Sequence, residues 1–139
     1  MVKLLQGLVA DHNVETHVEL LASILEGEPF EEMWSFLALD VESFETIGLR
    51  PDAPDRQVWE VCQDRRLMLV TANRRQERED SLENTIRLLN QTDSVPVVTL
   101  ADAVRLLKRK PYARRVAERL LEHLFDIEYY LGAGRLYLP

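Results

Sequence analysis

Cysteine is nearly absent from this chain of 139 residues, with Cys62 as its one example. No disulfide can therefore form within the chain, which suits a reducing compartment. No apolar run approaches the length of a membrane span, and the first apolar stretch is too short for a signal peptide. We expect a cytoplasmic protein without a membrane partner. The apolar content of 46% and the length favour one globular domain over residues 1–139.

Glycine is scarce at five residues, and the glycine-rich phosphate-binding motifs are missing. The absence of G-x-x-x-x-G-K and G-x-G-x-x-G argues against the usual P-loop and dinucleotide-binding sites. The three histidines, His12, His17 and His123, have no zinc-site spacing. Cys62 falls on the apolar face of an expected helix without a matched histidine. We interpret it as an inert core thiol and not as a nucleophile.

Charge is unevenly distributed along the chain, whose net charge is -7. Residues 1–64 hold 14 acidic and 3 basic residues, whereas residues 65–139 hold 10 acidic and 14 basic residues. The basic residues concentrate in the segment 105–119, which contains Arg105, Lys108, Arg109, Lys110, Arg114, Arg115 and Arg119. Such a segment suits contact with RNA phosphates or with an acidic protein partner. A solvated helix face is the alternative.

Two short apolar runs end abruptly in polar residues. One runs from Leu4 to Ala10 and stops at Asp11, and the other runs from Leu67 to Ala72 and stops at Asn73. Runs of this kind, each followed by a helical pattern, are typical of buried parallel strands. Ligands of open α/β sheets bind outside the carboxyl ends of the strands. Asp11 and Asn73 are therefore candidate site residues.

Strand and helix patterns alternate along the rest of the chain. We expect strands at 3–10, 44–49, 67–72 and 95–100, and helices at 13–26, 30–37, 55–64, 81–90, 102–110 and 112–130. This order predicts an α/β fold, a three-layer sandwich with a mostly parallel four- to five-stranded sheet and helices on both faces.

The end of the chain is apolar and follows a glycine hinge. Leu136 and Leu138 alternate with Tyr137, which suits an added edge strand with the two leucines facing inward. Apolar terminal residues are usually held against a core or a second subunit. We therefore expect an ordered tail, packed either on the chain's own core or on a second copy in a homodimer.

Two aspartates are the strongest candidate metal ligands. Asp11, at the end of a strand and before a helix, can ligate a hard cation such as Mg²⁺, although it could instead cap that helix together with Asn13. Asp55 opens a helix, so it could serve as a helix cap instead of as a metal ligand. Asp52 is a second candidate for the same capping position. If that helix starts beside the strand of Asp11, Asp55 and Asp11 could share a metal.

The polar turn after the second apolar run supplies other candidates. The amide of Asn73 suits orienting a water or a phosphate. Arg74 and Arg75 could hold a phosphate through bidentate hydrogen bonds. An ordinary solvated loop is the alternative for this segment.

Two sequence segments resemble the PIN-like superfamily of metal-dependent nucleases, in particular small bacterial proteins of the Mut7-C and DUF5615 kind. LVADHNV resembles the opening strand that ends in the first acid of that family. PDRQVWEVCQDRRLMLVTAN resembles the part in which an aspartate opens a helix and a strand then ends in T-x-D. The resemblance covers the first two-thirds of the chain. It implies a PIN-like fold and an endoribonuclease that uses Mg²⁺ or Mn²⁺.

The resemblance assigns roles to individual residues. Asp11 and Asp55 take the positions of the first two acids as catalytic metal ligands, and Asn73 replaces the third acid. A further acid could come from the following loop, from Glu77, Glu79 or Asp80. Two interpretations stay open: an endoribonuclease weakened by Asn73, in which Asn73 positions water or phosphate, and a non-catalytic PIN-like module for binding or interaction.

Overall fold

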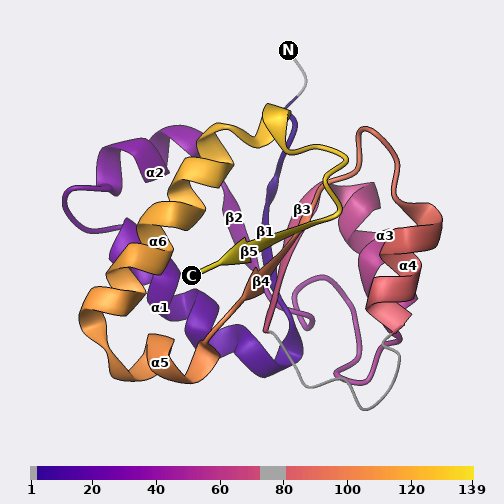
Figure 1. The fold of residues 1–139 in the computed structure, drawn as a ribbon, viewed down its shortest axis with the longest axis horizontal. Helices are drawn as coiled ribbons and strands as arrows, with labels where there is room; N and C mark the ends of the chain where they lie inside the picture. Colours follow the sequence, from indigo (N-terminus) through magenta and orange to yellow (C-terminus); the bar gives the residue numbers. More distant parts are fainter. Residues whose placement is uncertain (1–2, 73–80) are drawn as a thin grey trace.

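One parallel sheet forms the centre of the computed structural model, which describes residues 3–72 and 81–139. Its strand order is β2-β1-β3-β4-β5, and every pairing between neighbours is parallel (Figure 1). The strands are β1 (Gly7–Ala10), β2 (Asp40–Glu42), β3 (Leu67–Ala72), β4 (Val97–Leu100) and β5 (Arg135–Leu138). Because helices cover both faces, the predicted α/β three-layer sandwich is confirmed.

Six helices in the described part of the chain cover the two faces of the sheet. On one side lie α1 (Glu15–Leu25), α2 (Glu31–Leu37), α5 (Ala103–Lys108) and α6 (Lys110–Phe125), and on the other side lie α3 (Asp55–Arg65) and α4 (Ser81–Leu89) (Figure 1). Two short 3-10 turns, His12–Val14 and Ile127–Tyr129, follow β1 and α6. None of the described helices has the length and apolar character needed to cross a membrane.

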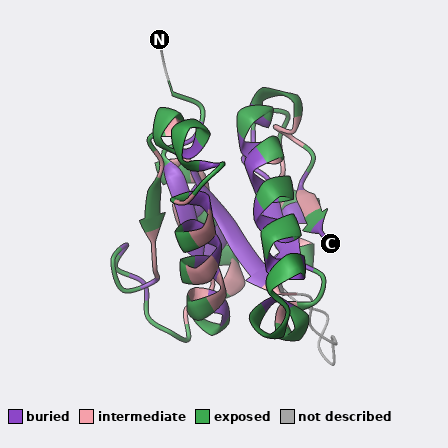
Figure 2. Cartoon of the chain, turned by 90° about the vertical axis from the view of Figure 1, so that its left-hand side faces the viewer, coloured by how far each residue is buried: buried purple, intermediate pink, exposed green. Residues whose placement is uncertain are grey.

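Side-chain alternation along the strands creates two separate cores. In β3, Met68 and Val70 pack in the core with α1 and α6, whereas Leu67 and Leu69 pack in the core with α3 and α4. Figure 2 shows the resulting pattern, with buried residues between the layers and exposed residues on the outer faces of the helices. A parallel sheet covered on both faces needs strands that are apolar on both faces, which explains the continuous apolar runs in the sequence.

The strand expected at residues 44–49 is wrong. These residues form turns, in which the Leu49 N–H donates to the Phe44 carbonyl at 2.8 Å. Ser43 and Thr46 stabilise the turn by exchanging backbone N–H to hydroxyl hydrogen bonds. The apolar residues that resembled a strand, Phe44, Ile47 and Leu49, instead cover the core beneath α3 and α4.

The actual edge strand, β2, pairs with β1 through a close backbone approach. A Cβ added to Gly7 would lie 2.3 Å from the Asp40 carbonyl oxygen, so only glycine fits there. β2 is short and mostly exposed, and it contains the acidic residues Asp40 and Glu42. Such a strand has no apolar alternation to reveal it in the sequence.

Helix ends differ in part from the prediction. Asn13 does not cap α1, since it lies within the 3-10 turn that precedes this helix and Val14 occupies the N-cap position. Pro111, expected to separate two helices, lies in the first turn of α6, where its missing N–H costs nothing. The boundaries of α3 and β3 agree with the prediction to within one residue.

The tail forms β5, which pairs in parallel with β4 on the chain's own sheet. Leu138 is 1% exposed and Tyr137 is 63% exposed, as the alternation predicts. The Tyr112 hydroxyl of α6 donates a hydrogen bond to the Pro139 carbonyl oxygen. The expectation of an ordered, packed edge strand is confirmed.

We predict that Leu138→Ala lowers the free energy of unfolding by about 2–5 kcal/mol, because it leaves a cavity beside α6. The matched control Tyr137→Ala changes an exposed neighbour in the same strand and should shift it by no more than about 0.5 kcal/mol. Urea denaturation of both variants is the measurement. Equal effects would show that β5 does not dock through Leu138.

Candidate functional site

The strand order reverses between β1 and β3, because β2 lies on the far side of β1. At such a point the chain leaves the carboxyl ends of the two neighbouring strands toward opposite faces of the sheet. In open α/β sheets, ligands generally bind outside the carboxyl ends of the strands at this place. β1 and β3 pair from Gly7 opposite Leu67 to Ala10 opposite Val70. The residues immediately after Ala10 and Val70 therefore line this edge of the sheet.

Asp11 is held across the β1–β3 junction by two hydrogen bonds. Its backbone N–H donates to the Val70 carbonyl at 2.9 Å, which extends the strand pairing by one residue. The Thr71 hydroxyl donates to Asp11 Oδ2 at 2.9 Å. The carboxylate makes no capping bond to the 3-10 turn that follows, so the capping alternative is wrong for Asp11.

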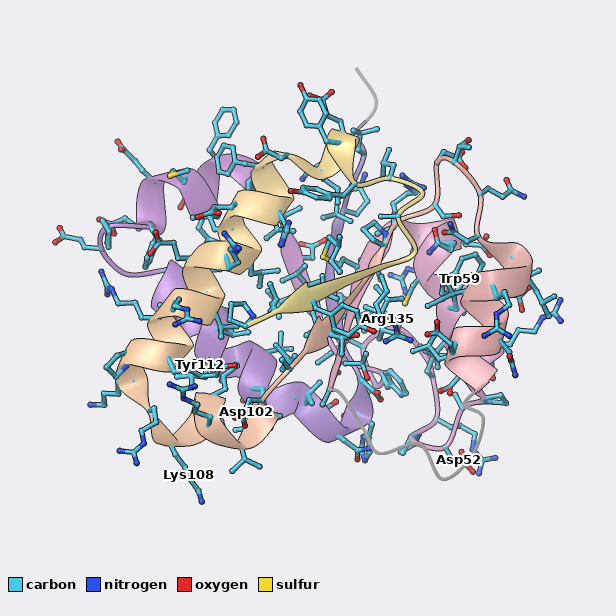
Figure 3. The ribbon with its side chains drawn as sticks, viewed as in Figure 1. Asp52, Trp59, Asp102, Lys108, Tyr112 and Arg135 are labelled. Atoms are coloured by element: carbon cyan, nitrogen blue, oxygen red, sulfur yellow. The ribbon has the colours of Figure 1, made fainter. Side chains whose placement is uncertain are left out.

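Asp55 is brought to the same edge by the direction of α3. This helix ends just before β3 and packs against it, so it runs antiparallel to the strand and its first turn lies toward the strand's carboxyl end. In Figure 3, Asp52 lies at that edge, whereas Trp59 lies farther along α3.

A capping role explains neither aspartate near the start of α3. Pro54 holds the N-cap position and makes no side-chain capping bond, and Asp55 is the first helical residue. Asp52 forms an exposed ion pair with Arg50 at 3.1 Å. The carboxylate of Asp55 in the first turn interacts favourably with the positive end of the helix dipole.

Several predicted site residues lie outside the described residues: Asn73, Arg74, Arg75, Glu77, Glu79 and Asp80. Within residues 3–72 and 81–139, no three His, Cys, Asp or Glu side chains gather into a metal-binding group. Of the sequence-predicted metal ligands, the structure brings Asp11 and Asp55 to one edge of the sheet. Their carboxylate oxygens are the donor type that Mg²⁺ and Mn²⁺ prefer.

Polar side chains continue across the sheet from Asp11. The register pairs Thr71 of β3 with Thr99 of β4, and Thr99 with Tyr137 of β5. Asp11 stands next to Thr71 in the same line, and alternation directs all four side chains toward the face of α3 and α4. We call Asp11, Thr71, Thr99 and Tyr137 the polar row. It lies at the carboxyl end of this face, where Thr71 and Thr99 are buried, at 4% and 1% exposure, and Tyr137 is exposed.

Arg135, which the sequence did not single out, reaches the polar row from the first position of β5. Its Nη1 donates to the Thr99 hydroxyl at 2.7 Å, and its Nη2 donates to Glu83 of α4 at 2.9 Å. Its side chain is 14% exposed. An arginine at the head of an otherwise apolar terminal strand is the one sequence signal that could have identified it.

The basic segment 105–119 occupies the α5–α6 corner, and we call it the basic corner. Its first part, residues 105–110, lies toward the same edge as Asp11, because α5 directly follows the carboxyl end of β4. α6 then carries Arg114, Arg115 and Arg119 back along the α1 face of the sheet, opposite to the face of the polar row. Asp102, whose carboxylate accepts from the Arg105 N–H at 3.0 Å, and Lys108 both lie there in Figure 3. The Arg105 guanidinium stacks on the Tyr112 ring at 4.4 Å. The seven cationic residues of the corner are exposed.

Cys62 is buried in the core between α3 and the sheet. The pKa of the Cys62 thiol is raised to about 12, chiefly by burial; Arg65 opposes this rise, and the Asp11 carboxylate adds a smaller contribution to it. A thiol of this kind stays protonated at neutral pH, in agreement with an inert core role.

Comparisons of this chain with protein-family models, with curated proteins and with solved structures found no significant match.

We predict that Cys62 in the folded protein resists an aromatic disulfide reagent at pH 8. Burial raises its pKa from the ordinary value of 9.0 to about 12, so a far smaller fraction of it is thiolate than in the unfolded chain. The reaction rate should rise at least about 100-fold in denaturant. Equal rates in the folded and unfolded states would contradict the buried position.

Proposed function

We propose that this protein is a PIN-like ribonuclease dependent on Mg²⁺ or Mn²⁺, with Asp11 and Asp55 as its metal ligands. The observation that carries the proposal is the position of Asp11 at the β1–β3 junction, where Thr71 holds its carboxylate at 2.9 Å. Asp55 starts a helix at the same edge. Mg²⁺ in enzymes is commonly bound by one or two carboxylates, with waters and substrate phosphates completing its shell.

Each residue of the site has a distinct part in this mechanism. A metal held by Asp11 and Asp55 would supply the hydroxide for phosphodiester cleavage and would neutralise the developing charge. Asp11 and Asp55 fix its place, and the Thr71 hydroxyl orients the carboxylate of Asp11. From the sequence alone, Asn73 would position water or phosphate, and Arg74 and Arg75 would bind the substrate.

The basic corner supports RNA as the partner. Binding of RNA depends on neutralising its phosphates, and the acidic first half of the chain opposes this. The exposed cations at the α5–α6 corner offset that repulsion at the edge that carries Asp11. A metal held by Asp11 and Asp55 would attract RNA phosphates as its substrate, so RNA is favoured over an acidic protein as the partner of residues 105–119.

A non-catalytic PIN-like module is the second candidate. It is favoured by Asn73, an amide at the position where the family carries its third acid. An amide oxygen is a weaker ligand for a hard cation than a carboxylate. Such a module would retain RNA binding at the basic corner without cleavage.

We predict that Asp11→Asn weakens Mn²⁺ binding at least about tenfold, because a charged ligand is lost. Calorimetric titration with Mn²⁺ measures the affinity, and cleavage of a labelled single-stranded RNA measures the activity. Asp52→Asn is the matched control: it removes the same charge from an exposed ion pair near the start of α3 and should leave both quantities unchanged.

Two outcomes would overturn the enzyme proposal. Equal Mn²⁺ affinity of the wild type and Asp11→Asn would mean that Asp11 holds no metal. Mn²⁺ binding that depends on Asp11, without any RNA cleavage by the wild type, would establish the non-catalytic module in its place.

A further inference from the structure

We propose that this chain associates with further copies of itself head to tail: the exposed face of α5 in one copy docks on an aromatic patch at the end of α6 in the next. The inference does not depend on the proposed function, under which RNA would compete with the second copy for residues 105–110. It is carried by two exposed apolar surfaces of opposite charge, which lie at the two ends of one helix.

Large apolar side chains are exposed where the end of α6 meets α2. The rings of Phe36 and Phe125 stack with their centroids 6.2 Å apart and their planes 10° apart, and Phe36 is 79% exposed. Met33, which is 45% exposed, lies one helical turn before Phe36 on the same side of α2. We call Met33, Phe36 and Phe125 the aromatic patch. Single exposed apolar side chains are ordinary on a protein surface, whereas contiguous ones mark interaction sites.

The segments that form the aromatic patch carry an excess of negative charge. Residues 4–49, which include α2, contain ten acidic residues and no lysine or arginine, and residues 120–134 contain three acidic residues and again no lysine or arginine. Four exposed carboxylates lie close to the patch in the sequence: Glu31, Glu32, Glu122 and Asp126. Two cations near this end are already engaged, since Lys3 donates to a backbone carbonyl after α2 and Arg119 pairs with Glu122 at 3.6 Å. The patch therefore suits a partner that is both apolar and cationic.

The exposed side of α5 has this composition. Val104 and Leu107, one helical turn apart, are 63% and 48% exposed, and Lys108 lies beside them on the same side of the helix. We call these three residues the α5 face. Leu106, on the opposite side, is 1% exposed and holds α5 against the core. Three further exposed cations flank the α5 face: Arg105, Arg109 and Lys110. An apolar pair among cations complements an apolar patch among carboxylates.

The two surfaces cannot meet within one molecule. α6 begins beside α5 and ends in the aromatic patch, and its 16 residues extend roughly 24 Å. In Figure 1, α5 lies at the lower left and α2 at the upper left, and Figure 3 places Lys108 at the lower end. The contact must therefore join two copies, and each of them retains one surface for a third. Such a contact is heterologous and produces a ring or an open chain.

A second copy is favoured as the occupant because the chain itself carries the matching surface. RNA or an anionic membrane would be attracted by the α5 face but repelled by the carboxylates around the aromatic patch, so neither explains both surfaces. A symmetric contact between two aromatic patches would bring the acidic residues of both copies together. Head-to-tail docking instead places each charge opposite its complement.

Sedimentation equilibrium of the full chain without RNA should show an average mass that rises with protein concentration above that of one chain. NaCl at about 1 M should reduce this association, because it shortens the Debye length from about 10 Å at about 0.1 M to about 3 Å. Phe36→Ala should weaken the association at least about tenfold, since buried aromatic anchors dominate such contacts. Leu88→Ala is the matched control: it truncates a 76% exposed side chain of α4, on the other side of the sheet, and should leave the association unchanged.

A mixing experiment distinguishes head-to-tail docking from a symmetric contact. Phe36→Asp disables the aromatic patch and Leu107→Asp disables the α5 face, so each variant alone should stay monomeric. Their equimolar mixture should form a heterodimer, in which the intact α5 face of the first variant docks on the intact patch of the second, and should grow no further. Both positions are exposed, and melting temperatures establish that the variants are folded. Met33→Asp takes the place of Phe36→Asp if that variant does not fold.

Four results would overturn the proposal. A wild type that stays monomeric up to about 1 mM has no such contact, and a mixture that stays monomeric shows that the two surfaces do not face each other. Association that Phe36→Asp abolishes and Leu107→Asp leaves intact would identify a symmetric contact between aromatic patches. A monomeric wild type whose binding to phosphatidylserine vesicles is abolished by Leu107→Asp would assign the α5 face to an anionic membrane instead.

Discussion

The parallel pairing of β1 with β3 is the constraint on which the candidate site depends. It continues one residue beyond β1, where the Asp11 N–H donates to the Val70 carbonyl. A shift of one residue would turn every side chain of β1 to the opposite face. Asp11 would then point toward α1, away from Thr71. The buried residues on both faces of β1, such as Leu8 and Val9, oppose that shift.

Opposite charges are gathered at one edge of the sheet by the topology. The carboxylates of Asp11 and Asp55 come from the acidic half of the chain, whereas the basic corner comes from the basic half. The two sets lie on opposite faces of the sheet: the basic corner is on the face of α1 and α6, and the polar row is on the face of α3 and α4. Under the proposed function, a divalent cation would be held by the first set and an anionic chain by the second.

The strands predicted best from the sequence are those whose own residues carry the apolar pattern of a buried strand. β3 has a continuous apolar run, and β5 has alternation that matches its burial. β2 was missed because Gly7 of β1, not its own acidic residues, permits its pairing. Arg135 was missed because its partners, Glu83 and Thr99, are distant in sequence and only the fold brings them together. The place of Asp11 at the end of β1 was predicted because it ends an apolar run, a signal that is local.

The central claim is that Asp11 and Asp55 hold one divalent cation. Anomalous scattering from a crystal of the protein grown with Mn²⁺ tests it most directly. The account predicts a peak about 2.0–2.3 Å from carboxylate oxygens of both Asp11 and Asp55. A crystal with no peak at this edge, or with Mn²⁺ bound only elsewhere, would contradict it.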